Sequence, residues 1–515
     1  MKKIKILLLT FTVMSLSSCK DYLDINQDPA NPQVAEGYVL LPPIMQSMVR
    51  GEAFDSRYVG QYIQNWALSG GGNQWDRHGY VAGSDAAGEK WRQHYFALGK
   101  NLDIIIKDGT ETQKWDYVGV ALAIKAWSWQ STTDYHGEMI LKQIFEPNRY
   151  VFDYDGQDEI YAEVQKECND ALAALNRTDG NSSTASLLRG DAFSSYKGDK
   201  NKWIKFVYAI LARNAHHISN KASYDPNKVI EYVDKSLASN ADNLNVIHNA
   251  SSSTDANFFG ALRNNMANYR QTIFALSLVD GTVFDKNIDP RLPFMFTPSP
   301  DGVYRGVFPG SGDPNNVAGN ARRIPTIWGI QPASIPSSIT KGKYVFQDAA
   351  DYPIITYSEL QFIKAEAALK KGDQAMALDA FNKGVNASMD FVNSYVPAAD
   401  RATFATNRTR YLASTAIPKT AATLKLSDIM LQKYISMYGH GALETWVDLR
   451  RHKYSPDVYT GFSLPTAFFP DNNDKPVQRV RPRFNSEYVW NRSSLEKLGG
   501  NNPDYHTYEM WFTKP

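Results

Sequence analysis

Apolar residues recur every three or four positions along much of the chain, and the segment 352–385 shows this pattern most clearly. The pattern is interrupted at 371–373, where Gly372 suits the left-handed conformation in which many helices end. Ser358 stands where a side chain caps a first helix, and Pro353 is expected to end the extended run before it. The segment is therefore predicted to form two antiparallel helices joined by a tight turn.

The same arrangement recurs elsewhere in the chain. Apolar stripes separated by Gly- or Asn-containing breaks predict helical hairpins near 91–130, 160–220, 356–387 and 426–451. A single hairpin cannot bury its apolar face alone, and a spacing of about 34 residues is typical of tetratricopeptide arrays. We therefore predict a mainly α-helical fold, a superhelix of tetratricopeptide-like hairpins with loop-rich insertions and short strands.

Three stretches lack a helical period. The regions 282–343 and 460–515 are predicted to be loops with short strands, and a glycine run at 70–72 leads into an aromatic loop. Loops held by a rigid frame are where binding residues concentrate. The helical hairpins are accordingly expected to carry a ligand-binding face rather than to form it.

The N-terminus predicts export. Three lysines within the first five residues precede an apolar run that is too short to span a bilayer, so residues 1–18 are predicted to be a signal peptide. The run ends in Leu-Ser-Ser-Cys, which resembles a lipobox and implies lipidation of Cys19. Residues 19–36 then form a lipidated tether and 37–515 the folded body. The alternative is a plain secretory signal with an unrelated cysteine.

Composition excludes several classes of function. A formal net charge of +1 provides no basic field, so nucleic acid is not an expected partner. With Cys19 assigned to lipid, Cys168 has no partner for an internal disulfide or a cysteine-rich zinc site. His216, His217 and His440 lack metal-ligand spacing, and no metal or cofactor is predicted.

Several motifs occur together in order along the chain. They are the lipobox at Cys19, an Ala-rich helix running into Asp-Tyr-His-Gly-Glu within 115–140, Asp-Pro-Arg-Leu-Pro at 289–293, the segment 356–368, and a charged aromatic segment at 432–454. This series resembles the SusD/RagB family of lipid-anchored nutrient-binding proteins. The resemblance implies four tetratricopeptide-like units, a lipid anchor in the outer membrane, exposure at the cell surface and a SusC-like TonB-dependent transporter as partner. It also implies a glycan ligand or, in some branches, a peptide.

Binding of a sugar needs aromatic rings for its C–H faces and polar side chains for its hydroxyl groups. The loop-rich stretches supply both kinds of residue. The candidate ligand-binding residues are Asn73, Trp75, Asp76 and Arg77 in the glycine loop, with Tyr304 and Trp328 in the region 282–343. The alternative for each ring is that it fixes its own loop to the scaffold.

Glu359 and Glu366 lie seven residues apart on one helical face, as a pair of glycosidase carboxylates might. A first-turn acid is also favoured by the helix dipole, and Lys370 lies one turn beyond Glu366. Near Trp446 a further charged set is expected to fix two helices together: Glu444, Asp448, Arg450 and Arg451. Structural roles are therefore preferred to catalytic ones.

The sequence thus predicts a non-catalytic, cell-surface lipoprotein that binds oligosaccharides and delivers them to a transporter. Within the same family, the alternative is capture of peptides. From other classes, the alternatives are a surface glycosidase, which is less favoured, and a purely structural lid that binds no free ligand.

Overall fold

The computed structural model describes residues 35–329 and 342–515. The predicted mainly α-helical fold is confirmed. Its helices are α2 (Gly37–Tyr62), α3 (Glu89–Arg92), α4 (Lys100–Glu111), α5 (Trp115–His136), α6 (Gln157–Leu175), α7 (Thr184–Gly190), α8 (Lys200–His217), α9 (Pro226–Lys235), α10 (Ile273–Ser277), α11 (Leu292–Met295), α12 (Tyr357–Lys371), α13 (Gln374–Asn393), α14 (Arg401–Ala413), α15 (Leu426–Met437), α16 (Ala442–Arg451) and α17 (Arg492–Lys497). The signal peptide, Cys19 and most of the predicted tether lie outside the described residues.

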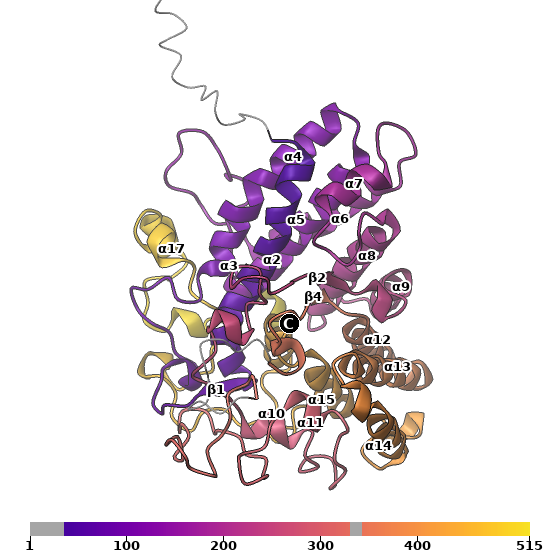
Figure 1. Cartoon of the computed structure of the whole chain (residues 1–515). Coiled ribbons are helices and arrows are strands. Elements are labelled where there is room, and N and C mark those ends of the chain that lie inside the picture. The colour runs from indigo at the N-terminus through magenta and orange to yellow at the C-terminus, as the bar shows by residue number, and fades with distance from the viewer. Residues whose placement is uncertain (1–34, 330–341) are drawn as a thin grey trace, which may run out of the picture.

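The larger helices form a continuous succession of neighbours. Contacts run from α4 to α5, α6, α8, α9, α12, α13 and α14 in turn. Figure 1 shows this succession descending one side of the molecule from α4 to α14. Helix α15 packs on α12 and α13, and α16 contacts α2 and α5. The resulting superhelix buries one extended apolar core.

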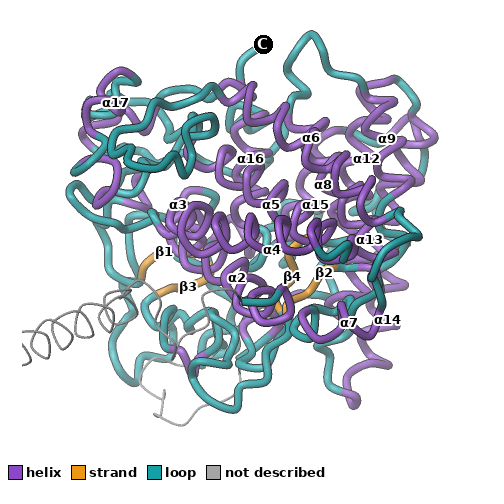
Figure 2. The backbone as a smooth tube through the Cα atoms, turned by 90° about the horizontal axis from the view of Figure 1, so that it is seen from above, coloured by secondary structure: helices purple, strands orange, loops and turns teal. Residues whose placement is uncertain are grey.

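Two small antiparallel sheets lie inside this frame (Figure 2). Strand β1 (Trp66–Leu68) pairs with β3 (Tyr269–Gln271), and β2 (Leu244–Val246) pairs with β4 (Tyr352–Ile355). Each sheet joins segments that are far apart in the sequence. The sheets therefore hold together distant segments of the chain that lie between its helices.

Helices α12 and α13 are the predicted hairpin at 352–385, with two corrections at its start. The strand β4 continues through Pro353 to Ile355, so Pro353 does not end the extended run. Thr356, not Ser358, caps α12, because its hydroxyl oxygen accepts a hydrogen bond from the backbone N–H of Glu359 (3.3 Å). Ser358 instead lies inside the helix and donates to the Gly384 carbonyl (2.9 Å). Gly372 ends α12 with φ of +87°, as predicted.

The loop-rich regions hold short helices as well as loops. Helix α11 lies within 282–343, and α17 lies within 460–515. Figure 1 shows α17 and the C-terminal loops on the side of the molecule opposite α12 to α14. Over residues 35–329 and 342–515, no helix combines the length and the apolar character needed to cross a bilayer.

Candidate functional site

A cleft of about 230 Å³ lies between the loop that follows Trp75 and the loops of the C-terminal region. Its two main walls are residues 80–88 and 479–492, which are separated by about 400 residues in the sequence. We call it the arginine cleft. Its lining includes the side chains of Arg479, Arg481, Arg483 and Arg492 and the rings of Trp75, Tyr80, Phe484 and Tyr488.

The two walls are held together by direct contacts. The Arg483 guanidinium pairs with the Asp85 carboxylate (2.9 Å), and the other Asp85 oxygen accepts from the backbone N–H of Asn485 (2.9 Å). At Gly88, a β-carbon would lie only 3.2 Å from the Cα of Arg483. A residue without a side chain therefore allows the second wall to approach the first.

Buried anchors fix the aromatic rings of the second wall. The carboxylate of Glu487 accepts hydrogen bonds from the Trp91 indole (3.0 Å) and the Tyr154 hydroxyl (2.5 Å). This holds a short π-helix, η10 (Phe484–Tyr488), whose terminal rings stack at 5.6 Å between centroids and 16° between planes. Single-turn π-helices occur frequently at functional sites. Both rings remain partly exposed.

Tyr80 provides the aromatic ring of the first wall. Its hydroxyl donates to the Asp471 carboxylate (2.9 Å), and the Arg481 guanidinium lies 4.0 Å from its ring centroid. Burial raises the pKa of the Tyr80 phenol, so it stays neutral and retains its proton. The cleft thus combines flat apolar surfaces with an excess of hydrogen-bond donors.

Of the four predicted residues of the glycine loop, Trp75 lines this cleft, and Asn73, Asp76 and Arg77 do not. Trp75 lines the cleft, although its ring is 6% exposed and packs on Tyr58 (4.6 Å between centroids). Asp76 accepts hydrogen bonds from the Asn73 amide and the Gly310 N–H, and its burial raises its pKa to about 7. Arg77 donates to two backbone carbonyls at 467 and 468. Asn73, Asp76 and Arg77 therefore position the loop that carries Trp75.

The other two candidate rings lie elsewhere. Trp328 is 1% exposed, and its indole N–H donates to the carbonyl of Phe259 (2.5 Å). Tyr304 is half-buried against the main core. The structure does not bring either ring to the arginine cleft, and the Trp328 ring has no face open to a sugar. For Trp328 this matches the alternative that the ring fixes its loop to the scaffold.

The second wall is not predicted from the sequence, where 460–515 is expected to hold only loops and short strands. A signal is nevertheless present in the alternating run Arg-Val-Arg-Pro-Arg-Phe at 479–484. In extended chain, alternate residues point to the same side, so the three arginines of this run share one face. Nothing in the run itself indicates that residues 80–88 form the opposite wall.

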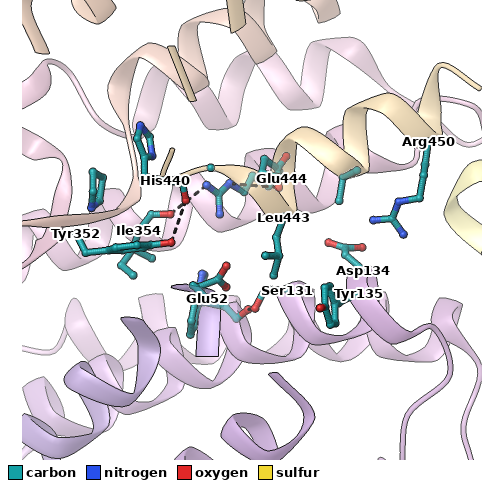
Figure 3. Close-up of a pocket in the computed structure, with 15 residues that line it drawn as sticks. Glu52, Ser131, Asp134, Tyr135, Tyr352, Ile354, His440, Leu443, Glu444 and Arg450 are labelled. Carbon is teal, nitrogen blue, oxygen red and sulfur yellow. Dashed lines mark hydrogen bonds and ion pairs between the residues drawn. The ribbon is translucent and has the colours of Figure 1, made fainter. Parts of the chain in front are cut away.

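A second, smaller cavity lies among the helices (Figure 3). It measures about 30 Å³, which is room for one or two water molecules. Carboxylates from three different helices face it, namely Glu52, Asp134 and Glu444, together with Arg213 and Arg450. This cavity is too small for a sugar and belongs to a buried network of charges that joins the helices.

The two glutamates considered as glycosidase acids belong to this network. Glu359 accepts two hydrogen bonds from the Arg213 guanidinium (2.5 and 2.6 Å), and Glu366 accepts two from Arg451 (2.9 Å each). Both carboxylates are fully buried and do not line the arginine cleft. Lys370, the expected partner of Glu366, instead donates to the Ser219 carbonyl (2.9 Å). Glu359 and Glu366 therefore hold helices α8, α12 and α16 together.

The predicted charge network around Trp446 is present. Arg451 pairs with Asp448 (2.6 Å) as well as Glu366, and Lys433 pairs with the other oxygen of Asp448 (2.7 Å). Glu444 accepts from His217 (2.7 Å). Arg450 lies over the Trp446 ring (3.7 Å to the centroid). These contacts fix α16 against α8, α12 and α15.

The adjacent histidines of α8 have opposite protonation behaviour. Burial disfavours the imidazolium form of His217, but the carboxylates of Glu444 and Asp134 outweigh it and raise its pKa to about 9. At His216 burial dominates over the attraction of Glu366 and lowers the pKa to about 4. In the described part of the chain, no cluster of three or more His, Cys, Asp or Glu residues is suited to a metal ion.

Comparison with known proteins identifies the family of this chain. A family model described as "Starch-binding associating with outer membrane" (SusD-like) matches residues 29–480. The chain belongs to the SusD-like family. This confirms the family predicted from the sequence. A search of curated proteins gives no significant match.

Solved structures share the SusD-like fold. A SusD/RagB family protein from Bacteroides thetaiotaomicron is 23% identical, with a TM-score of 0.73, over 93% of this chain and 99% of that one. A chitin-binding SusD homologue from Flavobacterium johnsoniae is 19% identical, with a TM-score of 0.65, over 93% of this chain and 96% of that one. Another structure, described as a chitin-binding protein, is 21% identical, with a TM-score of 0.66, over 93% and 99% of the two chains.

Proposed function

We propose that this SusD-like protein is a non-catalytic, glycan-binding lipoprotein of the outer membrane, which captures oligosaccharides at the cell surface. The observation that carries the proposal is the arginine cleft, where partly exposed aromatic rings lie beside hydrogen-bond donors in a loop region held by a rigid helical frame. Two structurally similar proteins are described as chitin-binding, which supports a saccharide ligand.

The arrangement suits binding rather than catalysis. Of the residues that the structure describes, no Asp or Glu lines the cleft, whereas hydrolysis of a glycosidic bond ordinarily uses a pair of carboxyl groups. Trp75, Tyr80, Phe484 and Tyr488 are the proposed contacts for the faces of sugar rings. Asn73, Asp76 and Arg77 are proposed to act through the loop that holds Trp75.

The replacement Phe484→Ala is expected to weaken oligosaccharide binding about fivefold or more, because truncating a central aromatic contact costs about 1 kcal/mol or more of binding free energy. Calorimetric titration of the purified full-length protein with a panel of oligosaccharides would measure this. Trp490→Ala is the matched control, since Trp490 is exposed and lies six residues further along the same segment, outside the cleft lining.

A larger cavity of about 380 Å³, lined by Trp511 and Tyr232 among others, is the competing location. Binding that survives Phe484→Ala but is lost on Trp511→Ala would place the site there and contradict the arginine cleft. Binding of peptides in the absence of any saccharide binding would contradict the proposed ligand class.

We further propose that Cys19 carries the lipid anchor and that the partner is a SusC-like TonB-dependent transporter, as the family resemblance implies. Affinity purification of the native protein from membranes is expected to recover a large outer-membrane barrel in a stoichiometric complex. The variant Cys19→Ala is expected to lose its association with membranes, because stable anchoring needs multiple acyl chains. Recovery of the native protein alone in repeated purifications would count against the partner.

A further inference from the structure

The arginine cleft has an unbalanced charge. Its lining contains four arginines, Arg479, Arg481, Arg483 and Arg492, and within the described residues no acidic side chain lines it. The chain as a whole carries a formal net charge of only +1. The concentration of arginine is therefore a local property of this site and does not follow from the overall composition.

Two of the four arginines are neutralised by carboxylates behind the lining. Arg479 pairs with Glu138 (2.5 Å) and donates to the Tyr505 hydroxyl (3.1 Å). Arg483 pairs with Asp85 (2.9 Å). These ion pairs fix the walls of the cleft and leave little positive charge at either residue.

The other two arginines keep their charge. Arg481 donates to the carbonyls of Gly500, Asn502 and Pro503 and to the Tyr488 hydroxyl, all of which are uncharged acceptors. Its Nε has no hydrogen-bond partner among the described residues. Arg492, at the start of α17, is exposed and forms no ion pair within residues 35–329 and 342–515. The positive charges of Arg481 and Arg492 are therefore uncompensated.

The balance of donors and acceptors leads to the same conclusion. A neutral sugar presents hydroxyl groups that both donate and accept, so a site for it needs acceptor side chains as well as donors. The guanidinium group is a donor only, and its planar fork matches the two oxygens of a carboxylate or sulfate. The lining has a single side-chain amide, at Asn501, and no carboxylate to accept from hydroxyl groups.

We infer that the arginine cleft binds acidic saccharides, with Arg492 facing a carboxylate or sulfate group, Arg481 adding positive charge to the lining, and the aromatic rings contacting the sugar faces. This inference rests on the proposed glycan-binding function. Carboxylate and sulfate groups offer the same acceptor chemistry, and the choice between them is left to the probes.

Titration of the full-length protein with matched ligands tests the inference. The probes are an oligogalacturonate, the same oligosaccharide with its carboxylates methyl-esterified, a sulfated galactan oligosaccharide and a neutral chito-oligosaccharide. We expect at least one charged probe to bind about tenfold or more tightly than the methyl ester, since hydrogen bonds to charged groups are roughly twice as strong as neutral ones. Its affinity is expected to fall as salt is added.

The variant Arg492→Gln is expected to weaken binding of the charged probe about three- to tenfold and to weaken binding of the methyl ester less, because a neutral ester carbonyl is a poorer acceptor than a charged oxygen. Arg410→Gln is the matched control, because Arg410 is equally exposed on α14, on the opposite side of the molecule in Figures 1 and 2. The thermal unfolding of both variants is expected to match that of the wild type.

The outcomes separate the two proposals. Equal affinity for the ester and the charged probes, with no effect of Arg492→Gln, overturns the acidic ligand while leaving glycan binding in place. Binding of an acidic peptide in preference to every charged saccharide also overturns it. Absence of binding to all four probes contradicts the proposed function itself, and the inference with it.

Discussion

Replacing Arg451 with Met is expected to lower the free energy of unfolding by about 3–5 kcal/mol, the cost that follows when one partner of a buried ion pair is removed. Arg451 is fully buried and donates to both oxygens of Glu366 (2.9 Å each) and to Asp448 (2.6 Å). Burial opposes ionisation of Glu366, but Arg451 and His216 outweigh it and hold its pKa well below the ordinary value. Without Arg451, the Glu366 carboxylate remains buried but loses its main ion-pair partner.

Urea denaturation of the wild type and the variant would measure the loss. Arg410→Met is the matched control, since Arg410 is exposed and its side chain bonds Asn407, and it is expected to change stability by less than about 0.5 kcal/mol. Arg451→Lys keeps the charge but not the bidentate geometry, so an intermediate loss is expected. A loss below about 1 kcal/mol for Arg451→Met would show that the network contributes little to stability.

His217 is expected to make the stability of the protein fall as pH rises. Its pKa is about 9 in the folded protein and 6.5 ordinarily, so the folded state binds the proton more tightly. The stabilisation is fully present below pH 6.5 and is lost as pH rises toward 9. With about 1.4 kcal/mol for each pKa unit, it amounts to about 3 kcal/mol. Beside the carboxylates of Asp134 and Glu444, the His217 side chain faces the Tyr161 hydroxyl and the Phe512 ring.

The difference in unfolding free energy between the wild type and His217→Gln, measured from pH 6 to pH 9.5, isolates this contribution from other titrating groups. It is expected to be largest at pH 6 and to shrink steadily above it. His216→Gln is the neighbouring control, because a pKa lowered to about 4 confines the pH dependence of His216 to below 6.5, so its difference from the wild type is expected to stay nearly constant above pH 6.5. A pH-independent difference for His217→Gln would mean that folding does not change the pKa of His217.

The helical part of the fold was predictable because it depends on local periodicity. The hairpin of α12 and α13 follows from its apolar spacing and from Gly372. The start of α12 was predicted two residues late, since both Thr356 and Ser358 are chemically able to cap a helix. The sequence did not show that Thr356 follows directly on a strand, because the partner of β4 lies at 244–246, more than 100 residues earlier.

Sequence pattern indicates only one side of the arginine cleft. The glycine loop was identified from its own composition, and Trp75 does line the cleft. Tyr80 and the second wall were missed because their role depends on a contact between distant segments. The same limit applies to the glutamates, since the partners Arg213 and Arg451 lie 146 and 85 residues away from Glu359 and Glu366. The local sequence pattern shows that a charged residue is present, but it does not show with which distant residue that charge pairs.

The wide sequence separation between the walls of the arginine cleft has a consequence for how the protein is made. Residues 80–88 are synthesised early, whereas Arg483 and η10 follow about 400 residues later. An incompletely synthesised or partly folded chain therefore lacks one wall of the arginine cleft, and the proposed saccharide binding would report a finished molecule. A bound ligand would contact both residues 80–88 and residues 479–492 and would stabilise the contact between them. At 100 times its dissociation constant it would add about 2.7 kcal/mol of protection against their separation.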